Sequence, residues 1–249
     1  MTPAEFLFRP LLAALICLFA ASDLRAAEPT DFGEAVIAAP DRNAEDVKAD
    51  KRRQPAKLID FTGVKPGMTV MDMMAGGGYT TELMARAVGG SGRVYAQSSP
   101  EAPERARQAL LQRLTRPAMA NVELAETPIE SPVPHAVHNL DLITFVLNYH
   151  DVTYMPVDRA RMNKALFDGL KKGGVLVIVD HAALPGQGIG VAKTLHRIEE
   201  SVVISEVEAA GFKKVAEANF LRNPNDHMDL PFFEMDQDTD RFVLKFVKP

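Results

Sequence analysis

The sequence has little cysteine and no excess of positive charge, and its one local basic cluster, residues 48–53, is interpreted as the solvated face of a helix. Its 249 residues include a single cysteine, Cys17, and its 28 Lys and Arg are outnumbered by 33 Asp and Glu, for a formal net charge of −5. General nucleic-acid binders carry a basic patch or stripe, and none is evident here, so we expect no nucleic-acid partner. After Cys17 the chain has no thiol to oxidise, which suits an oxidising compartment, and no cysteine that could act as a nucleophile.

Long apolar runs are missing beyond the first 27 residues. Residues 11–21 are uniformly apolar, follow Arg9 and precede several small residues, a pattern typical of a secretory signal peptide. The run is shorter than the roughly 20 residues that span a bilayer, although an uncleaved anchor or a buried helix stays open. We expect residues 1–27 to be a signal peptide with an undetermined cleavage site. The mature protein would then be exported, to the periplasm or the medium, without stable membrane insertion.

The rest of the chain predicts one α/β domain. Residues 28–41 are polar with little periodicity and are interpreted as a linker, and the domain covers residues 42–249. Short apolar runs predict strands over residues 68–73, 93–97, 121–125, 140–147, 175–179, 213–220 and 241–247. Helical patterns predict helices over residues 42–61 (interrupted at Pro55), 80–88, 103–114, 158–170 and 191–210.

Most of these strands are apolar nearly throughout and are separated by helices. This arrangement indicates a mostly parallel sheet with helices on both faces. The last two strands follow one another without a helix between them, which predicts an antiparallel strand at the C-terminal end of the sheet.

Three consecutive glycines connect the first predicted strand to the next helix, in residues 70–79 (VMDMMAGGGY). Ligands of open parallel sheets bind outside the carboxyl ends of the strands, and glycine lets backbone approach a ligand closely. A dinucleotide loop needs Gly or Ala where Thr81 stands, and a P-loop ends in Gly-Lys-Ser/Thr, so neither motif fits. What remains is an acidic residue, Asp72, four positions before Gly76.

That spacing resembles the first motif of the class I S-adenosylmethionine-dependent methyltransferases. The resemblance covers about residues 42–249 and implies a Rossmann-like methyltransferase fold of about seven strands, with S-adenosylmethionine as the cofactor. Further matches lie at Gly67 and at residues 170–174 and 210–212. Three shorter runs, residues 76–83, 148–151 and 239–242, resemble a group of exported, uncharacterised predicted methyltransferases.

The resemblance also implies which residues hold the cofactor: Asp72, Ala75, Gly76, Gly78, Tyr79, Gln97 and Asn148. Two positions depart from the family pattern. Met74 stands where the first glycine is usual, and Gln97 stands where an acidic residue usually holds the ribose hydroxyls. Because an amide is not a bidentate anionic acceptor, we expect weaker cofactor binding. Replacing Gly78 with Val is expected to block the cleft and leave the fold intact.

The catalytic candidates follow the fourth predicted strand, which in the resembled fold faces the transferring methyl group. His150 is the candidate general base because its unperturbed pKa lies near neutrality. Asp151 could orient it, and Tyr149 could position a substrate by hydrogen bonding or stacking. A polar loop without catalytic function is the alternative for this run.

Other histidines have weaker signals. His181 ends the fifth strand, where a structural role is simpler, and Arg197, next to His196, is expected to form a surface ion pair with Glu200. His135 and His138 form a possible metal pair, but without helical spacing or a cysteine pair the signal is weak, and we predict no metal site.

We therefore expect S-adenosylmethionine-dependent methyl transfer to a small-molecule acceptor. Two alternatives stay open, since an exported enzyme has no evident supply of a cytosolic cofactor. One is a non-enzymatic or repurposed ligand-binding module on this fold, and the other is a metal-assisted hydrolase built around the histidines. The oligomeric state is not predicted.

Overall fold

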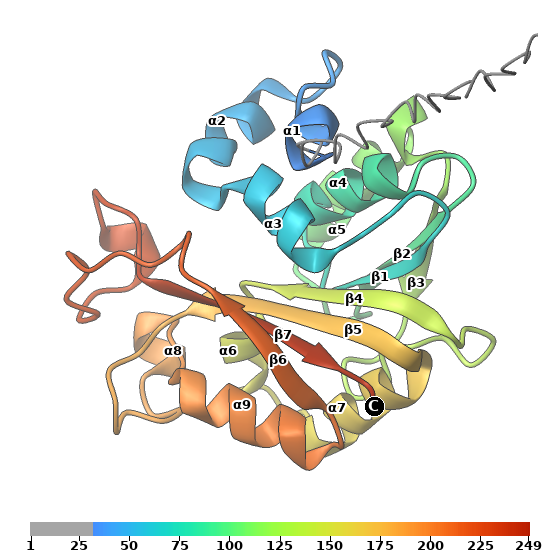
Figure 1. Ribbon diagram of the computed structural model, residues 1–249. Helices are drawn as coiled ribbons and strands as arrows, with labels where there is room; N and C mark the ends of the chain where they lie inside the picture. The colour runs from blue at the N-terminus through green and yellow to red at the C-terminus, as the bar shows by residue number, and fades with distance from the viewer. Residues whose placement is uncertain (1–31) are drawn as a thin grey trace, which may run out of the picture. The chain divides into compact units, whose positions relative to one another are not determined.

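A seven-stranded sheet organises residues 32–249, the part of the chain that the computed structural model describes (Figure 1). The strand order is β3-β2-β1-β4-β5-β7-β6. The strands are β1 (Thr69–Met73), β2 (Arg93–Ser98), β3 (Val122–Glu126), β4 (Leu140–Val146), β5 (Leu170–His181), β6 (Lys213–Ala218) and β7 (Arg241–Val247). Strands β1 to β5 pair in parallel, and β7 runs antiparallel to both β5 and β6. The predicted fold class is confirmed.

Helices cover both faces of the sheet, α1 to α5 on one side and α6 to α9 on the other (Figure 1). They are α1 (Phe32–Ile37), α2 (Ala44–Arg53), α3 (Pro55–Thr62), α4 (Tyr79–Val88), α5 (Glu104–Leu114), α6 (Tyr149–Val152), α7 (Arg159–Gly169), α8 (Ala192–Leu195) and α9 (Glu200–Ala209). Two short 3₁₀ turns, Pro117–Met119 and Phe232–Glu234, complete the described elements. None of these helices combines the length and apolarity needed to cross a membrane.

The central strands are apolar on both faces because each face packs under a helical layer. In β4, Ile143 and Phe145 belong to one buried cluster, while Leu142 belongs to the other. Successive side chains of a strand point to opposite faces, so a strand between two helical layers has no polar side. This explains why β4 is apolar nearly throughout, with Asp141 and Thr144 as its only polar residues.

The region interpreted as a linker, residues 28–41, contains a packed helix. Val36 of α1 is buried, and the backbone N–H of Gly33 donates to Asp60 Oδ1 at 2.8 Å. A Cβ at Gly33 would lie 2.1 Å from the carbonyl oxygen of Ala56. The backbones of α1 and α3 are therefore so close at this point that only glycine fits. The predicted signal peptide lies outside the described residues.

The predicted helix over residues 191–210 is also different, because it is two helices. His196 has φ 52° and ends α8. Arg197 follows and is fully buried. The turn allows Arg197 to reach the interior, which a continuous surface helix would not.

The strand order reverses between β1 and β4. The chain winds from β1 to β2 and β3 in one direction and from β4 to β5 in the other, while Met73 at the end of β1 pairs with Phe145 near the end of β4. The carboxyl ends of these strands therefore flank the position where open α/β sheets bind ligands.

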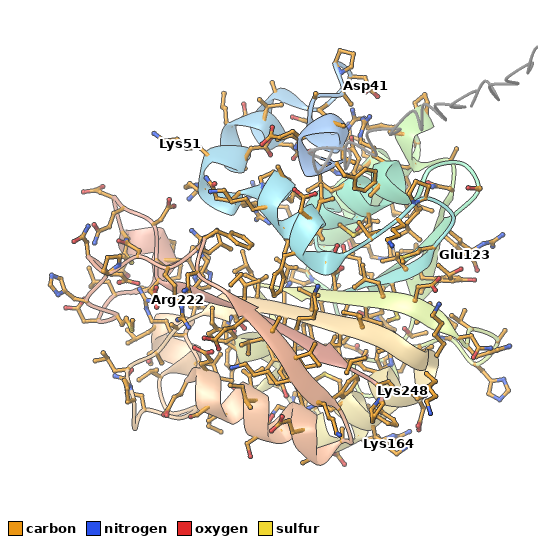
Figure 2. The ribbon with its side chains drawn as sticks, viewed as in Figure 1. Asp41, Lys51, Glu123, Lys164, Arg222 and Lys248 are labelled. Atoms are coloured by element: carbon orange, nitrogen blue, oxygen red, sulfur yellow. The ribbon has the colours of Figure 1, made fainter. Side chains whose placement is uncertain are left out.

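Charged side chains of both signs project from the outside of the fold. Figure 2 shows Lys51 on α2, Glu123 on β3 and Lys164 on α7, and all three are exposed.

Candidate active site

A cavity of about 620 Å³ opens at the carboxyl ends of β1, β4 and β5. Its size lies in the range of small-molecule sites, about 300–1,000 Å³. One wall is the loop after β1, and a second is α2, through Arg52 and Arg53. Across from them lie groups from the ends of β4 and β5, from the end of α8 and from the segment that leads into β7: Asn148, His150, Asp151, His181, His196, Phe232, Phe233, Thr239 and Arg241.

The loop after β1 has the backbone conformation of a glycine loop, although Met74 stands at the position where the first glycine is usual. Met74 has φ 50°, a left-handed conformation that costs a non-glycine residue about 1–2 kcal/mol. Two side chains hold it there. Gln97 Oε1 accepts the Met74 N–H at 2.9 Å, and Asn148 Nδ2 donates to the Met74 carbonyl oxygen at 3.2 Å.

Two glycines of this loop face different surroundings. A Cβ on Gly76 would meet no atom within 4 Å, and Gly76 lines the cavity. A Cβ on Gly78 would lie 2.9 Å from side-chain atoms of both Leu110 and Arg113 on α5. A valine at Gly78 would therefore require Leu110 and Arg113 to shift, and it would point toward α5 and not into the cavity, which Gly78 does not line. The expectation that Gly78→Val blocks the cleft is not supported, and its effect on the fold stays a prediction.

Asp72 supports the loop from below. It is 2% exposed, and its carboxylate accepts hydrogen bonds from Thr81 Oγ1 at 2.6 Å and Thr144 Oγ1 at 2.8 Å. Burial raises the pKa of Asp72 to about 6, against the opposing effect of the two hydroxyl donors. Asp72 thus ties the end of β1 to β4 and α4 at the floor of the cavity.

This raised pKa predicts a pH-dependent stability. Because the pKa of Asp72 is higher in the folded than in the unfolded chain, its contribution to stability is fully present below the unfolded pKa of 3.8 and is lost as pH rises through 6. We expect wild-type protein to lose about 2 kcal/mol relative to Asp72→Asn between pH 4 and pH 7. Urea unfolding of both proteins at several pH values measures this difference, and a difference that does not change with pH would refute the assignment.

The helix α2 is fixed over the cavity by polar contacts. The Tyr79 hydroxyl donates to Asp50 Oδ1 at 2.7 Å, and Arg113 forms a two-point ion pair with Asp46. The guanidinium carbon of Arg53 lies 4.6 Å from the centre of the Tyr79 ring. These contacts place a partly buried cation, Arg53, at the edge of the glycine loop.

A histidine–carboxylate pair forms the opposite wall. His150 is 2% exposed, and its Nδ1 lies 2.7 Å from Asp180 Oδ1. Asp180 is fully buried and also accepts the backbone N–H groups of His150 and His181, at 2.7 and 2.8 Å. The His150 ring is therefore held in one orientation, with Nε2 on the side away from Asp180.

The charges around His150 do not favour the neutral ring that a general base needs before it accepts a proton. Burial disfavours the charged His150 ring, but attraction to the Asp180 and Asp151 carboxylates and the hydrogen bond with Asp180 outweigh burial and raise its pKa to about 10. A protonated imidazole cannot accept a proton. Burial and the neighbouring His150 lower the pKa of His181 well below its ordinary value, so His181 remains neutral.

Aromatic rings cover the histidines on the open side. Phe232 stacks on His181, with ring centres 5.2 Å apart and planes 2° from parallel. His196 contacts both Phe232 and Phe233 edge to face, at 5.9 and 5.5 Å. Phe233 is 61% exposed and Phe232 43%, so this wall is an apolar surface at the mouth of the cavity.

The structure brings most of the predicted site residues to the cavity. Those that line it are Asp72, Ala75, Gly76, Tyr79, Asn148, His150 and Asp151. Gly78, Gln97 and Tyr149 do not line it. The Gln97 amide is completely buried, and its Nε2 donates to the Thr127 carbonyl oxygen at 2.8 Å, so Gln97 supports the loop from inside the protein.

Tyr149 points away from the cavity and does not position a substrate there. Its ring is fully buried against Phe145, its hydroxyl donates to Glu206 on α9 at 2.8 Å, and Asn163 on α7 donates to the hydroxyl at 2.8 Å. The tyrosine anchors α6 to the helices below the sheet.

Several site residues were not found by sequence reasoning. Asp180 was not singled out in the sequence, although its position at the carboxyl end of a predicted strand could have indicated a site residue. Arg53, Phe232 and Phe233 lie on segments without a motif. Arg197 pairs with Asp226 at 2.7 Å, not with Glu200 as expected, while Glu200 pairs with Arg222.

Comparison with solved structures decides the fold. A SAM-dependent methyltransferase from Aquifex aeolicus has a TM-score of 0.60 at 18% identity, over 87% of this chain and 98% of that chain. Aeropyrum pernix fibrillarin, solved with natively bound S-adenosyl-L-methionine, has a TM-score of 0.52 at 18% identity, over 77% and 74% of the two chains. The chain has the Rossmann-like methyltransferase fold. The cavity lies at the switch point of this fold.

Sequence comparison finds relatives over part of the chain. The ubiquinone/menaquinone biosynthesis C-methyltransferase UbiE of Klebsiella pneumoniae is 29% identical over 122 residues, which are 49% of this chain and 46% of the relative. The UbiE of Escherichia coli O1:K1 is 28% identical over the same length. The match thus spans about half the length of these curated relatives. No protein-family model matches the chain.

Proposed function

We propose that this protein is an S-adenosylmethionine-dependent methyltransferase that acts on a small-molecule acceptor. The observation that carries the proposal is the cavity at the β1–β4 switch point, with an open glycine loop on one wall and a rigid polar cluster on the other. Methyltransferase relatives and the methyltransferase fold support it.

The loop side of the cavity fits the cofactor. The position of a Gly76 Cβ is open space that faces the cavity, so a ligand can approach the backbone there. Asn148, fixed by its bonds to the Met74 and Val146 carbonyl oxygens, borders the same space. Arg53 offers a cation suited to the carboxylate of the methionine part, because burial lowers the pKa of its guanidinium and an anion would offset that burial.

When bound, S-adenosylmethionine supplies an electrophilic methyl group. The chain then has to align an acceptor atom and exclude water. His150, locked by Asp180, and Asp151 beside it border the acceptor side, and Phe232 and Phe233 provide apolar cover. A charged His150 would orient an anionic or hydrogen-bond-accepting group of the acceptor and would not remove its proton.

The acceptor is proposed to be small and partly aromatic or apolar. The support is the cavity volume, the two exposed phenylalanines at its mouth, and relatives named for quinone biosynthesis. A net charge of −5 disfavours a nucleic-acid acceptor. We also propose, from the pattern of residues 1–27 alone, that the protein is exported. A mature N-terminus still beginning at Met1 would count against that.

A label-transfer assay tests the proposed function. The protein is incubated with S-adenosylmethionine labelled in the methyl group and with small phenols, quinols and carboxylic acids, and in parallel with RNA. We expect label in the small-molecule fraction and none in the RNA. Label in RNA alone would contradict the acceptor class.

A further inference from the structure

One buried nitrogen in the cavity wall has no hydrogen-bond partner. His150 Nε2 is completely buried, and among residues 32–249 only Asn163 Oδ1 is likewise a buried side-chain atom without a partner. The ring cannot turn to pair Nε2 elsewhere, because Nδ1 is held by Asp180. An unpaired buried polar atom costs about 1–3 kcal/mol, so Nε2 points to a ligand.

Two more ligand atoms converge on this nitrogen. Asp151 Oδ1 lies 3.2 Å from His150 Nε2, without the direction of a hydrogen bond, and 3.6 Å from His196 Nδ1. All three groups offer atoms within 4.8 Å of one another. Bonds of about 2.0–2.1 Å in a tetrahedral zinc site put neighbouring ligand atoms roughly 3.3 Å apart, which agrees with both separations.

The surrounding groups fit a metal site as well. A histidine that binds a metal usually gives its other ring N–H to a carboxylate, which fixes the ring, and Asp180 holds His150 Nδ1 at 2.7 Å. The Tyr154 hydroxyl donates to the Asp151 carboxylate and holds it in place. A metal ion at Nε2 would take the place of the proton there, because a ligating nitrogen must be deprotonated. The Asp151 and Asp180 carboxylates that stabilise the protonated ring would then stabilise the metal cation, and the acceptor would meet the ion in place of a charged His150.

We propose that His150 Nε2, the Asp151 carboxylate and His196 Nδ1 form a binding site for a divalent transition-metal ion such as Zn²⁺. Two imidazoles and one carboxylate match the preference of such ions, whereas Mg²⁺ and Ca²⁺ prefer oxygen ligands alone. The site differs from the pair that the sequence suggested, because His135 and His138 are exposed and lie outside this cluster.

Three protein ligands leave a coordination position free for a further ligand. All three residues line the cavity, so we infer that an oxygen of the acceptor takes this position, next to Phe232 and Phe233. This second step rests on the proposed function, while the metal site itself does not.

Calorimetric titration of chelator-treated protein with Zn²⁺, without cofactor, tests the site. We expect one ion to bind with micromolar affinity or better, and Mg²⁺ at least about tenfold more weakly. His196→Ala should weaken Zn²⁺ binding by at least about tenfold and Asp180→Asn by about 10–100-fold. The His196 side chain is 27% exposed, so its loss should leave the fold intact, which the melting temperature checks.

The matched control is His138→Ala, an exposed histidine outside the cluster, which should bind Zn²⁺ like wild type. Wild-type affinity in His196→Ala, or loss of binding in His138→Ala instead, would overturn the site. S-adenosylhomocysteine binding is measured on the same samples. Zn²⁺ binding without S-adenosylhomocysteine binding would reject the proposed function and keep the metal site. S-adenosylhomocysteine binding without Zn²⁺ binding would keep the function and reject the metal site.

Discussion

Replacing Arg197 with methionine is expected to lower the free energy of unfolding by about 3–5 kcal/mol, because it leaves a buried carboxylate without its partner. The Arg197 and Asp226 side chains are 0% and 1% exposed. Arg197 donates from Nη1 and Nη2 to the two carboxylate oxygens at 2.7 and 3.1 Å, and from Nη1 to the Ala182 carbonyl oxygen at 3.1 Å. No other ion pair that Lys or Arg forms among the described residues is as deeply buried on both sides.

The same arginine holds a wall of the cavity. Its Nε donates to the Leu230 carbonyl oxygen at 3.0 Å, and the segment from Asp226 to β7 carries Phe232, Phe233 and Thr239. Loss of Arg197 should therefore also loosen this wall.

Arg93→Met is the matched control for this prediction. Arg93 forms an exposed pair with Glu123, with side chains 59% and 56% exposed, and such pairs contribute about 0–1 kcal/mol. Urea unfolding of both variants gives the comparison. Equal, small losses in the two variants would show that the buried pair does not hold the segment.

Replacing Gly76 with alanine is expected to weaken S-adenosylhomocysteine binding by at least about tenfold, equivalent to about 1.4 kcal/mol. The added methyl group would project into the open space of the cavity. Gly76 has φ 55°, so alanine also brings backbone strain of about 1–2 kcal/mol.

Gly63→Ala separates the two effects. Gly63 has φ 74° and equally open surroundings, but it ends α3 and does not line the cavity. It should carry the same strain and bind S-adenosylhomocysteine like wild type, as measured by calorimetry. If Gly76→Ala and Gly63→Ala bind S-adenosylhomocysteine equally well, a methyl group at Gly76 does not hinder binding and the cofactor lies elsewhere.

Local patterns in the sequence predicted the sheet well. The apolar run over residues 140–147 became β4 (Leu140–Val146), and the glycine loop began α4 as expected. The antiparallel direction of β7 was predicted, but its position between β5 and β6 was not, because strand order depends on contacts between distant segments. The helix α1 was missed because six residues are too short to show periodicity.

The sequence predicted the site residues that lie at the ends of strands. It did not predict those that come together from distant segments. Asp72, Gly76 and His150 follow strand ends, which face the ligand side of the sheet. The roles of Tyr149 and Gln97 were misjudged because neighbouring residues of a helix or strand point in different directions. The Asp180–His150 and Arg197–Asp226 pairs join residues about 30 positions apart, and no local pattern signals them.

The most direct test of the account is calorimetric titration of the protein with S-adenosylmethionine and S-adenosylhomocysteine. We predict one site per chain with micromolar affinity or better for at least one of the two compounds, and at least about tenfold weaker binding in Gly76→Ala. No binding of either compound up to millimolar concentration would contradict it and would mean that the methyltransferase fold serves another ligand here.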